Sequence, residues 1–175
     1  MRHDGIWGNI FRFGRKRESL ADVLHHIPLF AELTPKELRI LEQAVHIRTY
    51  QADEPIFSEN EAGAGMYVIR TGHVNIRMQR SAQPLLLAEL EPGDFFGEMA
   101  LLVDTARSAT AVATEPSELI GFFHPDLLDI INFHPQTGAK ISIGLAKTLA
   151  ERLRYTNDQL REMWDIRGPH EASVR

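Results

Sequence analysis

The sequence predicts an α+β fold in which helices flank a small antiparallel β sandwich. Apolar residues recur at helical spacing up to about residue 45, alternate with a period of two over 46–123, and return to helical spacing over 124–167. Glycine and proline separate the alternating segments, which is typical of a closed sandwich or jelly roll. The length of 175 residues, with 43% hydrophobic and 25% charged residues, fits one globular domain.

The first 19 residues are expected to form a basic, aromatic tail. Residues 1–17 contain five Lys or Arg and one Asp, which gives this segment a charge of +4. Because the net charge of the whole chain is −5, the other 158 residues must carry −9. The segment lacks the unbroken apolar core and the cleavage site of a secretory signal. A tail without a partner is the simple interpretation, and contact of residues 1–17 with an anionic membrane surface is the alternative.

Two helices are expected between Leu20 and Val45, separated by a break at Pro28. Apolar residues in both follow the helical period. The second helix starts with a capping box, because Thr34 can accept from free backbone N–H groups while Glu37 reaches back to the Thr34 N–H. The alternating region that follows predicts a set of short strands, at 66–71, 74–78, 85–90, 109–113 and 118–123.

A short helix over 127–131 and a long helix from about Thr137 to Arg167 complete the fold. The long helix exceeds what one small core can cover. Along it, residues recur at alternating spacings of three and four, as in a two-helix seam, at Ala146, Leu149, Leu153, Thr156, Leu160 and Met163. We therefore expect residues 137–165 to join two copies of the chain as a parallel homodimer. Packing of this helix on its own domain is the alternative.

The segment 92–110 contains the residues expected to carry chemistry. Gly97 lets the backbone approach a ligand, and residues 98–102 can form one helical turn whose free N–H groups face an anion. Arg107 can pair with a phosphate through two parallel N–H bonds. Glu98 beside an anion needs a donor of its own, such as a ribose hydroxyl. From spacing alone, an internal ion pair between Glu98 and Arg107 is an equal alternative.

This segment resembles the phosphate-binding cassette of the cyclic nucleotide-binding domain family, in Phe-Gly-Glu-Met-Ala-Leu at 96–101 and Arg-Ser-Ala-Thr at 107–110. The family includes bacterial catabolite activator proteins, regulatory subunits of protein kinase A and cyclic nucleotide-gated channels. Further stretches that resemble it are 27–33, 66–74 and 150–157. The resemblance covers about residues 20–165 and implies an eight-stranded antiparallel β jelly roll with entry helices. The implied divisions are 20–134 for this domain, 135–167 for the long helix and 168–175 for a tail.

The resemblance implies roles for the cassette residues. Gly97 and Ala100 would offer backbone N–H groups to the ligand, and Glu98 would accept from the ribose 2′-hydroxyl. Arg107 would neutralise the cyclic phosphate, and Ser108 would add a hydroxyl contact. On the residues alone, Ser108 could instead cap a strand end.

The resemblance also implies contacts outside the cassette. Ile76 and Leu87 match apolar positions that wall the sugar and base, although they would be core residues with any ligand. Thr156, with Asn157 beside it, matches an adenine contact from the long helix; the alternative is that Thr156 is only a polar seam residue. The complete set of expected ligand-binding residues is Gly97, Glu98, Met99, Ala100, Arg107, Ser108, Ile76, Leu87, Thr156 and Asn157.

The chain departs from the family pattern in two places. Asn60-Glu61 stands where the family usually has Gly-Asp, and Asn tolerates the left-handed backbone that such a turn needs. After the long helix the sequence reaches Gly168-Pro169 and stops at Arg175, where a catabolite activator would continue into a helix-turn-helix. We therefore expect no DNA binding by this chain, in agreement with its acidic balance.

Other classes of protein find little support in the sequence. The absence of cysteine excludes thiolate zinc sites and cysteine nucleophiles, and the eight histidines are scattered, so we expect no metal and no enzyme. No apolar stretch reaches the ~18 residues of a membrane span.

These observations favour a cytoplasmic, homodimeric, stand-alone sensor of a cyclic nucleotide, with cyclic AMP preferred and cyclic GMP as the alternative ligand. Its output would pass to an unidentified effector protein. Two alternative interpretations are a degenerate domain that serves as a dimerisation or docking module, and the sensory part of a transcription regulator of the catabolite activator type.

Overall fold

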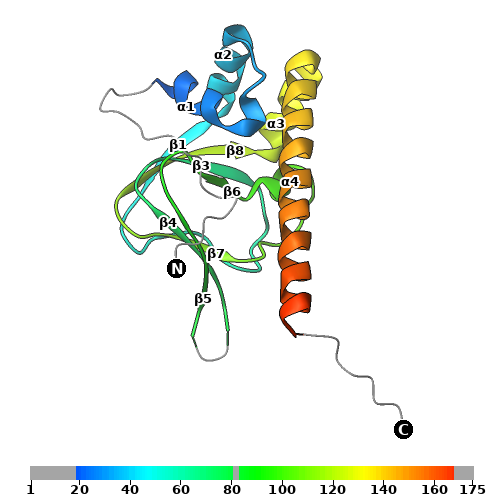
Figure 1. The fold of residues 1–175 in the computed structure, drawn as a ribbon. Helices are drawn as coiled ribbons and strands as arrows, with labels where there is room; N and C mark the ends of the chain where they lie inside the picture. The colour runs from blue at the N-terminus through cyan, green and yellow to red at the C-terminus, as the bar shows by residue number, and fades with distance from the viewer. Residues whose placement is uncertain (1–18, 81–82, 168–175) are drawn as a thin grey trace.

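The computed structural model describes residues 19–80 and 83–167 (Figure 1). Three short helical elements precede the sheets. They are α1 (Leu20–His26), the 3-10 turn η1 (Pro28–Phe30) and α2 (Pro35–Ala44). The predicted capping box is confirmed, because the Thr34 N–H and hydroxyl both donate to the Glu37 carboxylate at 2.7 Å. The basic residues 1–17 and the tail after 167 lie outside the described residues.

Eight antiparallel strands form two facing four-stranded sheets, which confirms the predicted jelly roll. One sheet has the order β1-β8-β3-β6 and the other β2-β7-β4-β5. The strands are β1 (His46–Tyr50), β2 (Pro55–Phe57), β3 (Gly65–Thr71), β4 (Val74–Met78), β5 (Leu85–Leu90), β6 (Phe95–Phe96), β7 (Thr110–Ala113) and β8 (Ser117–Phe123).

Two apolar clusters hold these layers together. The cluster between the sheets includes Tyr50, Ile69 and Phe96. The other joins the first sheet to the helices and includes Phe30 and Phe122, whose rings meet edge to face. The helices therefore share a core with the sheet that contains β6, the strand directly before Gly97.

Two helices follow the sheets, α3 (His124–Phe133) and α4 (Pro135–Arg167). The first half of α4 is closely packed on the N-terminal elements, because Gly144 lies so near Leu29 that a Cβ there would clash with the Leu29 carbonyl. An ion pair of 2.7 Å between Lys140 and Glu37 fastens α4 to α2. In Figure 1, α4 begins beside α2 and α3 and extends along one side of the molecule toward the C-terminus.

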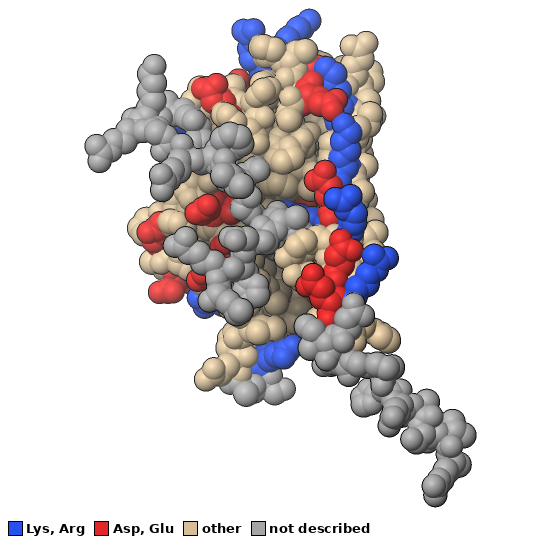
Figure 2. Space-filling model, viewed as in Figure 1, with Lys and Arg blue, Asp and Glu red and all other residues tan. Residues whose placement is uncertain are grey.

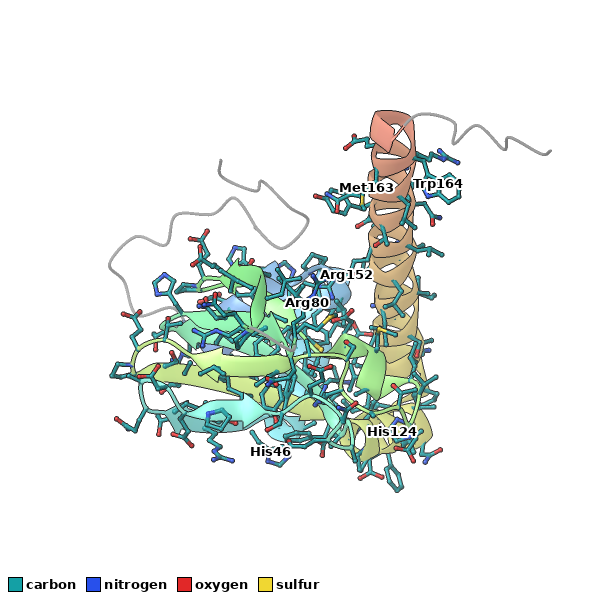
Figure 3. All side chains as sticks on the ribbon, turned by 90° about the horizontal axis from the view of Figure 1, so that it is seen from below. His46, Arg80, His124, Arg152, Met163 and Trp164 are labelled. Carbon is teal, nitrogen blue, oxygen red and sulfur yellow. The ribbon has the colours of Figure 1, made fainter. Side chains whose placement is uncertain are left out.

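The second half of α4 leaves the domain, and its apolar residues face outward. Figure 3 shows Met163 and Trp164 on turns that stand clear of the sheets. Leu153 is 63% exposed and Trp164 77% exposed. Leu149, by contrast, packs partly against the domain's own core. The predicted seam therefore has two parts. In its first turns Leu149 packs on the chain's own core, whereas the apolar residues of its later turns are exposed.

Candidate functional site

A sharp backbone turn after β6 opens the candidate site. Gly97 adopts a φ of +79° and caps η2 (Glu98–Leu101), a 3-10 turn at the place where the sequence predicted one helical turn over 98–102. A Cβ at Gly97 would lie 2.7 Å from Nη1 of Arg107. Glycine is therefore required here twice, once for the left-handed backbone and once for the close approach of the guanidinium.

Arg107 is a buried cation at the centre of this turn, with only 8% of its surface exposed. Its Nη1 donates to the Gly97 carbonyl at 3.3 Å and its Nη2 to the Gly65 carbonyl at 2.8 Å. Its guanidinium carbon lies 4.0 Å from the centre of the Phe57 ring. Within the described residues, Nε is buried without a hydrogen-bond partner.

Burial lowers the pKa of Arg107 below its usual value, because desolvation disfavours the charged form. An arginine nevertheless stays protonated in a protein. The site therefore holds a positive charge that is largely removed from water. Its guanidinium hydrogen-bonds to two neutral carbonyls, and its buried Nε–H has no hydrogen-bond partner among the described residues. Such a group binds an oxyanion strongly.

The loop before β3 fixes the backbone on both sides of Arg107. The Arg107 N–H donates to the Glu61 carbonyl at 2.8 Å, and the Asn60 N–H donates to the Arg107 carbonyl at 2.9 Å. Asn60 has a φ of +69°, so it adopts the left-handed conformation expected of it. The departure from the family's glycine is thus accommodated without loss of the turn.

Glu98, 3% exposed, is also buried, but its ion-pair partner is Arg152 of α4 and not Arg107. The internal Glu98–Arg107 pair that spacing allowed is therefore not the arrangement that forms. Arg152 also donates to the Phe95 carbonyl at 3.2 Å and lies 4.8 Å from the centre of the Phe95 ring. Figure 3 shows Arg152 at the point where α4 meets the sheets.

This contact of Arg152 was not predicted from the sequence. The signal that could have found it is its spacing, because Arg152 lies four residues before Thr156 and so shares a helix face with it. In the structure the Thr156 hydroxyl donates to the Arg152 carbonyl at 2.9 Å, and the Thr156 side chain is exposed. Asn157 is exposed as well.

The remaining predicted site residues divide by burial. Ala100, beside Glu98 on η2, and Ile76 on β4 are buried. Leu87 on β5 is 45% exposed, and Met99 and Ser108 are exposed. The structure therefore brings Gly97 and Arg107 into direct contact, whereas the buried Glu98, next to Gly97 in the chain, pairs with Arg152. Thr156 and Asn157 lie one turn further along α4 than the Arg152 contact.

Charged side chains cover the surface of α4 in alternation (Figure 2). On α4, Lys147 pairs with Glu32 at 2.6 Å and Arg161 pairs with Asp158 at 3.4 Å. In the described ranges, no three His, Asp or Glu side chains gather as a metal site would require. Over the same ranges, no helix is both long and apolar enough to cross a membrane.

Comparison with known proteins identifies the class of domain. Residues 47–134 match the family profile of the cyclic nucleotide-binding domain. A cyclic AMP receptor protein of Thermus thermophilus is 37% identical over 134 residues, which are 76% of this chain and 60% of that protein. A cAMP-dependent protein kinase type II regulatory subunit of Drosophila melanogaster is 32% identical over 100 residues, which are 57% of this chain and 26% of that protein.

Among solved structures, the catabolite activator protein of Thermus thermophilus superposes with a TM-score of 0.70 at 36% identity. The superposition covers 78% of this chain and 62% of that structure. The chain thus spans less than two thirds of the length of these relatives. The family match over 47–134 includes Gly97, Glu98 and Arg107.

Proposed function

The chain belongs to the cyclic nucleotide-binding domain family, and from that premise we propose that it is a regulatory sensor whose preferred ligand is cyclic AMP. The observation that carries the proposal is Arg107, a buried cation with a spare N–H beside the Gly97 turn. A cyclic phosphate diester supplies one negative charge and the acceptor oxygens that this cation lacks. The similarity to a cyclic AMP receptor protein and to a cAMP-dependent kinase subunit supports adenine as the base.

The cassette residues fit the phosphate and ribose of such a ligand. A guanidinium has five N–H donors, so Arg107 can keep both carbonyl bonds and still bind two phosphate oxygens. Backbone N–H groups of Gly97 and Ala100 and the Ser108 hydroxyl complete the phosphate site in this proposal. The Glu98 carboxylate has two oxygens with about four acceptor positions, so it can bind a ribose hydroxyl as well as Arg152.

The base would lie toward β4, β5 and α4. Ile76 and the half-exposed Leu87 offer apolar surface that a purine would cover. Thr156 and Asn157 carry hydroxyl and amide groups on the part of α4 that follows the Glu98–Arg152 contact. A ligand held at both places interacts with the cassette and with α4 together, so it shifts α4 if it binds one arrangement of the helix better than another.

Titration calorimetry of the intact chain with cyclic AMP and cyclic GMP tests the proposal. We expect saturable binding of cyclic AMP and weaker binding of cyclic GMP. Tighter binding of cyclic GMP would contradict the base assignment alone. No binding of either nucleotide would contradict the sensor function and favour a docking module that has lost its ligand.

We also propose that α4 joins two copies of the chain. The support is the uncovered apolar surface of its second half, formed by Leu153, Leu160, Met163 and Trp164. Sedimentation analysis should find a dimer for the intact chain and a monomer for the double variant Leu153→Glu/Leu160→Glu. The matched control is Arg154→Glu, at an exposed position on the same turn. A double variant that stays dimeric would contradict this interface.

Finally, we propose a cytoplasmic, non-enzymatic regulator that does not itself bind DNA and signals through a separate effector protein. The effector would contact the exposed end of α4 or the basic residues 1–17. The competing role for residues 1–17 is contact with an anionic membrane. Sedimentation with phosphatidylserine vesicles tests that role, because the full chain should then pellet more than a chain lacking residues 1–17.

A further inference from the structure

His124 stands at the junction of β8 and α3 and has no part in the function proposed above. Its ring Nδ1 lies 2.7 Å from the carbonyl oxygen of Leu101, the last residue of η2. A carbonyl oxygen can only accept, so Nδ1 carries the proton in this hydrogen bond. The His124 backbone N–H donates to the Ala64 carbonyl at 2.9 Å. His124 thus connects the end of the cassette turn with the start of α3.

The other end of the same turn is fixed to the same region. Arg107 binds the carbonyls of Gly97, which caps η2, and of Gly65, the first residue of β3. Gly65 pairs with Phe123 in the β3–β8 register, immediately before His124. Both ends of η2 are therefore linked to the same region, in which the start of β3 pairs with the end of β8. Leu101 contacts His124, and Gly97 is linked to Gly65 through Arg107.

From His124 the contact continues into the long helix. His124 is the first residue of α3, and α3 packs on α4 through a close approach of Gly138 to Ile131. A Cβ on Gly138 would lie 2.7 Å from the Ile131 Cα, so the two helices have little freedom to slide independently. A displacement of the start of α3 is therefore passed to the first turns of α4.

We propose that His124 is a positioning residue that transmits nucleotide binding from the cassette turn to α3 and α4. This inference rests on the proposed function. A phosphate bound by Arg107 shares the guanidinium with the Gly97 and Gly65 carbonyls, so binding alters how the first end of η2 is held. The Nδ1–H bond to Leu101 makes the other end of the turn move together with α3, independently of the Glu98–Arg152 contact.

Two nearly isosteric substitutions separate the hydrogen bond from simple packing. His124→Asn keeps an N–H at the position of Nδ1, whereas His124→Leu has none. His124→Gln moves the N–H donor one bond further out. It replaces His124→Leu as the variant without a donor at the Nδ1 position if His124→Leu does not fold. The matched control is His134→Leu, because His134 is exposed, is the C-cap residue of α3 and also precedes a proline.

The readouts are cyclic AMP affinity by calorimetry and hydrogen exchange of α3 and α4 with and without cyclic AMP. We expect His124→Leu and His124→Gln to bind cyclic AMP with no more than about a tenfold loss and to lose the nucleotide-dependent change in exchange. His124→Asn and His134→Leu should keep it. Full nucleotide-dependent exchange in His124→Leu or His124→Gln, or its loss in His124→Asn, would overturn this proposal alone. Failure of the wild type to bind cyclic AMP would overturn the proposed function together with it.

Discussion

Replacing Arg152 with methionine should destabilise the chain more than any other single charge removal on α4. The Glu98 side chain is 4% exposed and its ion-pair partner, Arg152, is 15% exposed, so the substitution leaves a buried carboxylate without its counter-ion. Removing one partner of a buried ion pair costs about 3–5 kcal/mol. With a urea dependence of about 2 kcal/mol per M, the unfolding midpoint should fall by about 1.5–2.5 M.

Equilibrium unfolding in urea, followed by circular dichroism, measures this loss. Arg154→Met is the control, because Arg154 lies on the same turn but is exposed, and it should change stability by no more than about 0.5 kcal/mol. The double variant Glu98→Gln/Arg152→Met should recover much of the loss, since it removes both charges. A decrease below about 1 kcal/mol for Arg152→Met alone would refute the reasoning that this pair is buried and coupled.

Three further predictions concern the packing of α4 and the environment of the cation. Gly144→Ala should destabilise the chain by about 1–3 kcal/mol in urea unfolding, despite the better helix propensity of alanine, because its Cβ would clash with the Leu29 carbonyl. The bond from Lys140, with the capping box, lowers the pKa of Glu37 to about 2, so its stabilisation is present above about pH 4.5 and is lost as the pH falls toward 2. Glu37→Gln should therefore flatten the stability–pH profile over that range, and an unchanged profile would contradict it. Phe57→Leu should weaken cyclic AMP binding about threefold to tenfold in calorimetry by removing the ring 4.0 Å from the buried guanidinium.

The parts of the fold that the sequence predicted are those with strong local signals. The Thr34 capping box depends only on residues three positions apart, and the alternation in β4 follows from burial of one face of that strand. The strand β1 gave no such signal, because four of its five residues are exposed and only Tyr50 is buried. The two-residue β6 is too short to show a period.

The site was predictable only where its chemistry is local. Gly97, Glu98 and Arg107 lie within one segment, so their motif could be read from the sequence. The pairing of Glu98 with Arg152 depends on how α4 crosses the sheet, which no spacing within the segment specifies. Leu149 fits the seam in spacing, yet it packs on the domain's own core because α4 is still attached there.

The central claim is that Arg107 binds the phosphate of a cyclic nucleotide, and calorimetric titration of cyclic AMP into the wild type and Arg107→Met tests it most directly. Arg70→Met is the control, because Arg70 belongs to a different ion pair, with Glu118 at 2.8 Å. Loss of a buried charge pair worth about 3–5 kcal/mol predicts an affinity reduced by about a hundredfold to several thousandfold in a folded Arg107→Met, and a near-native affinity in the control. Equal affinities of wild type and Arg107→Met, or no binding by the wild type, would contradict the claim.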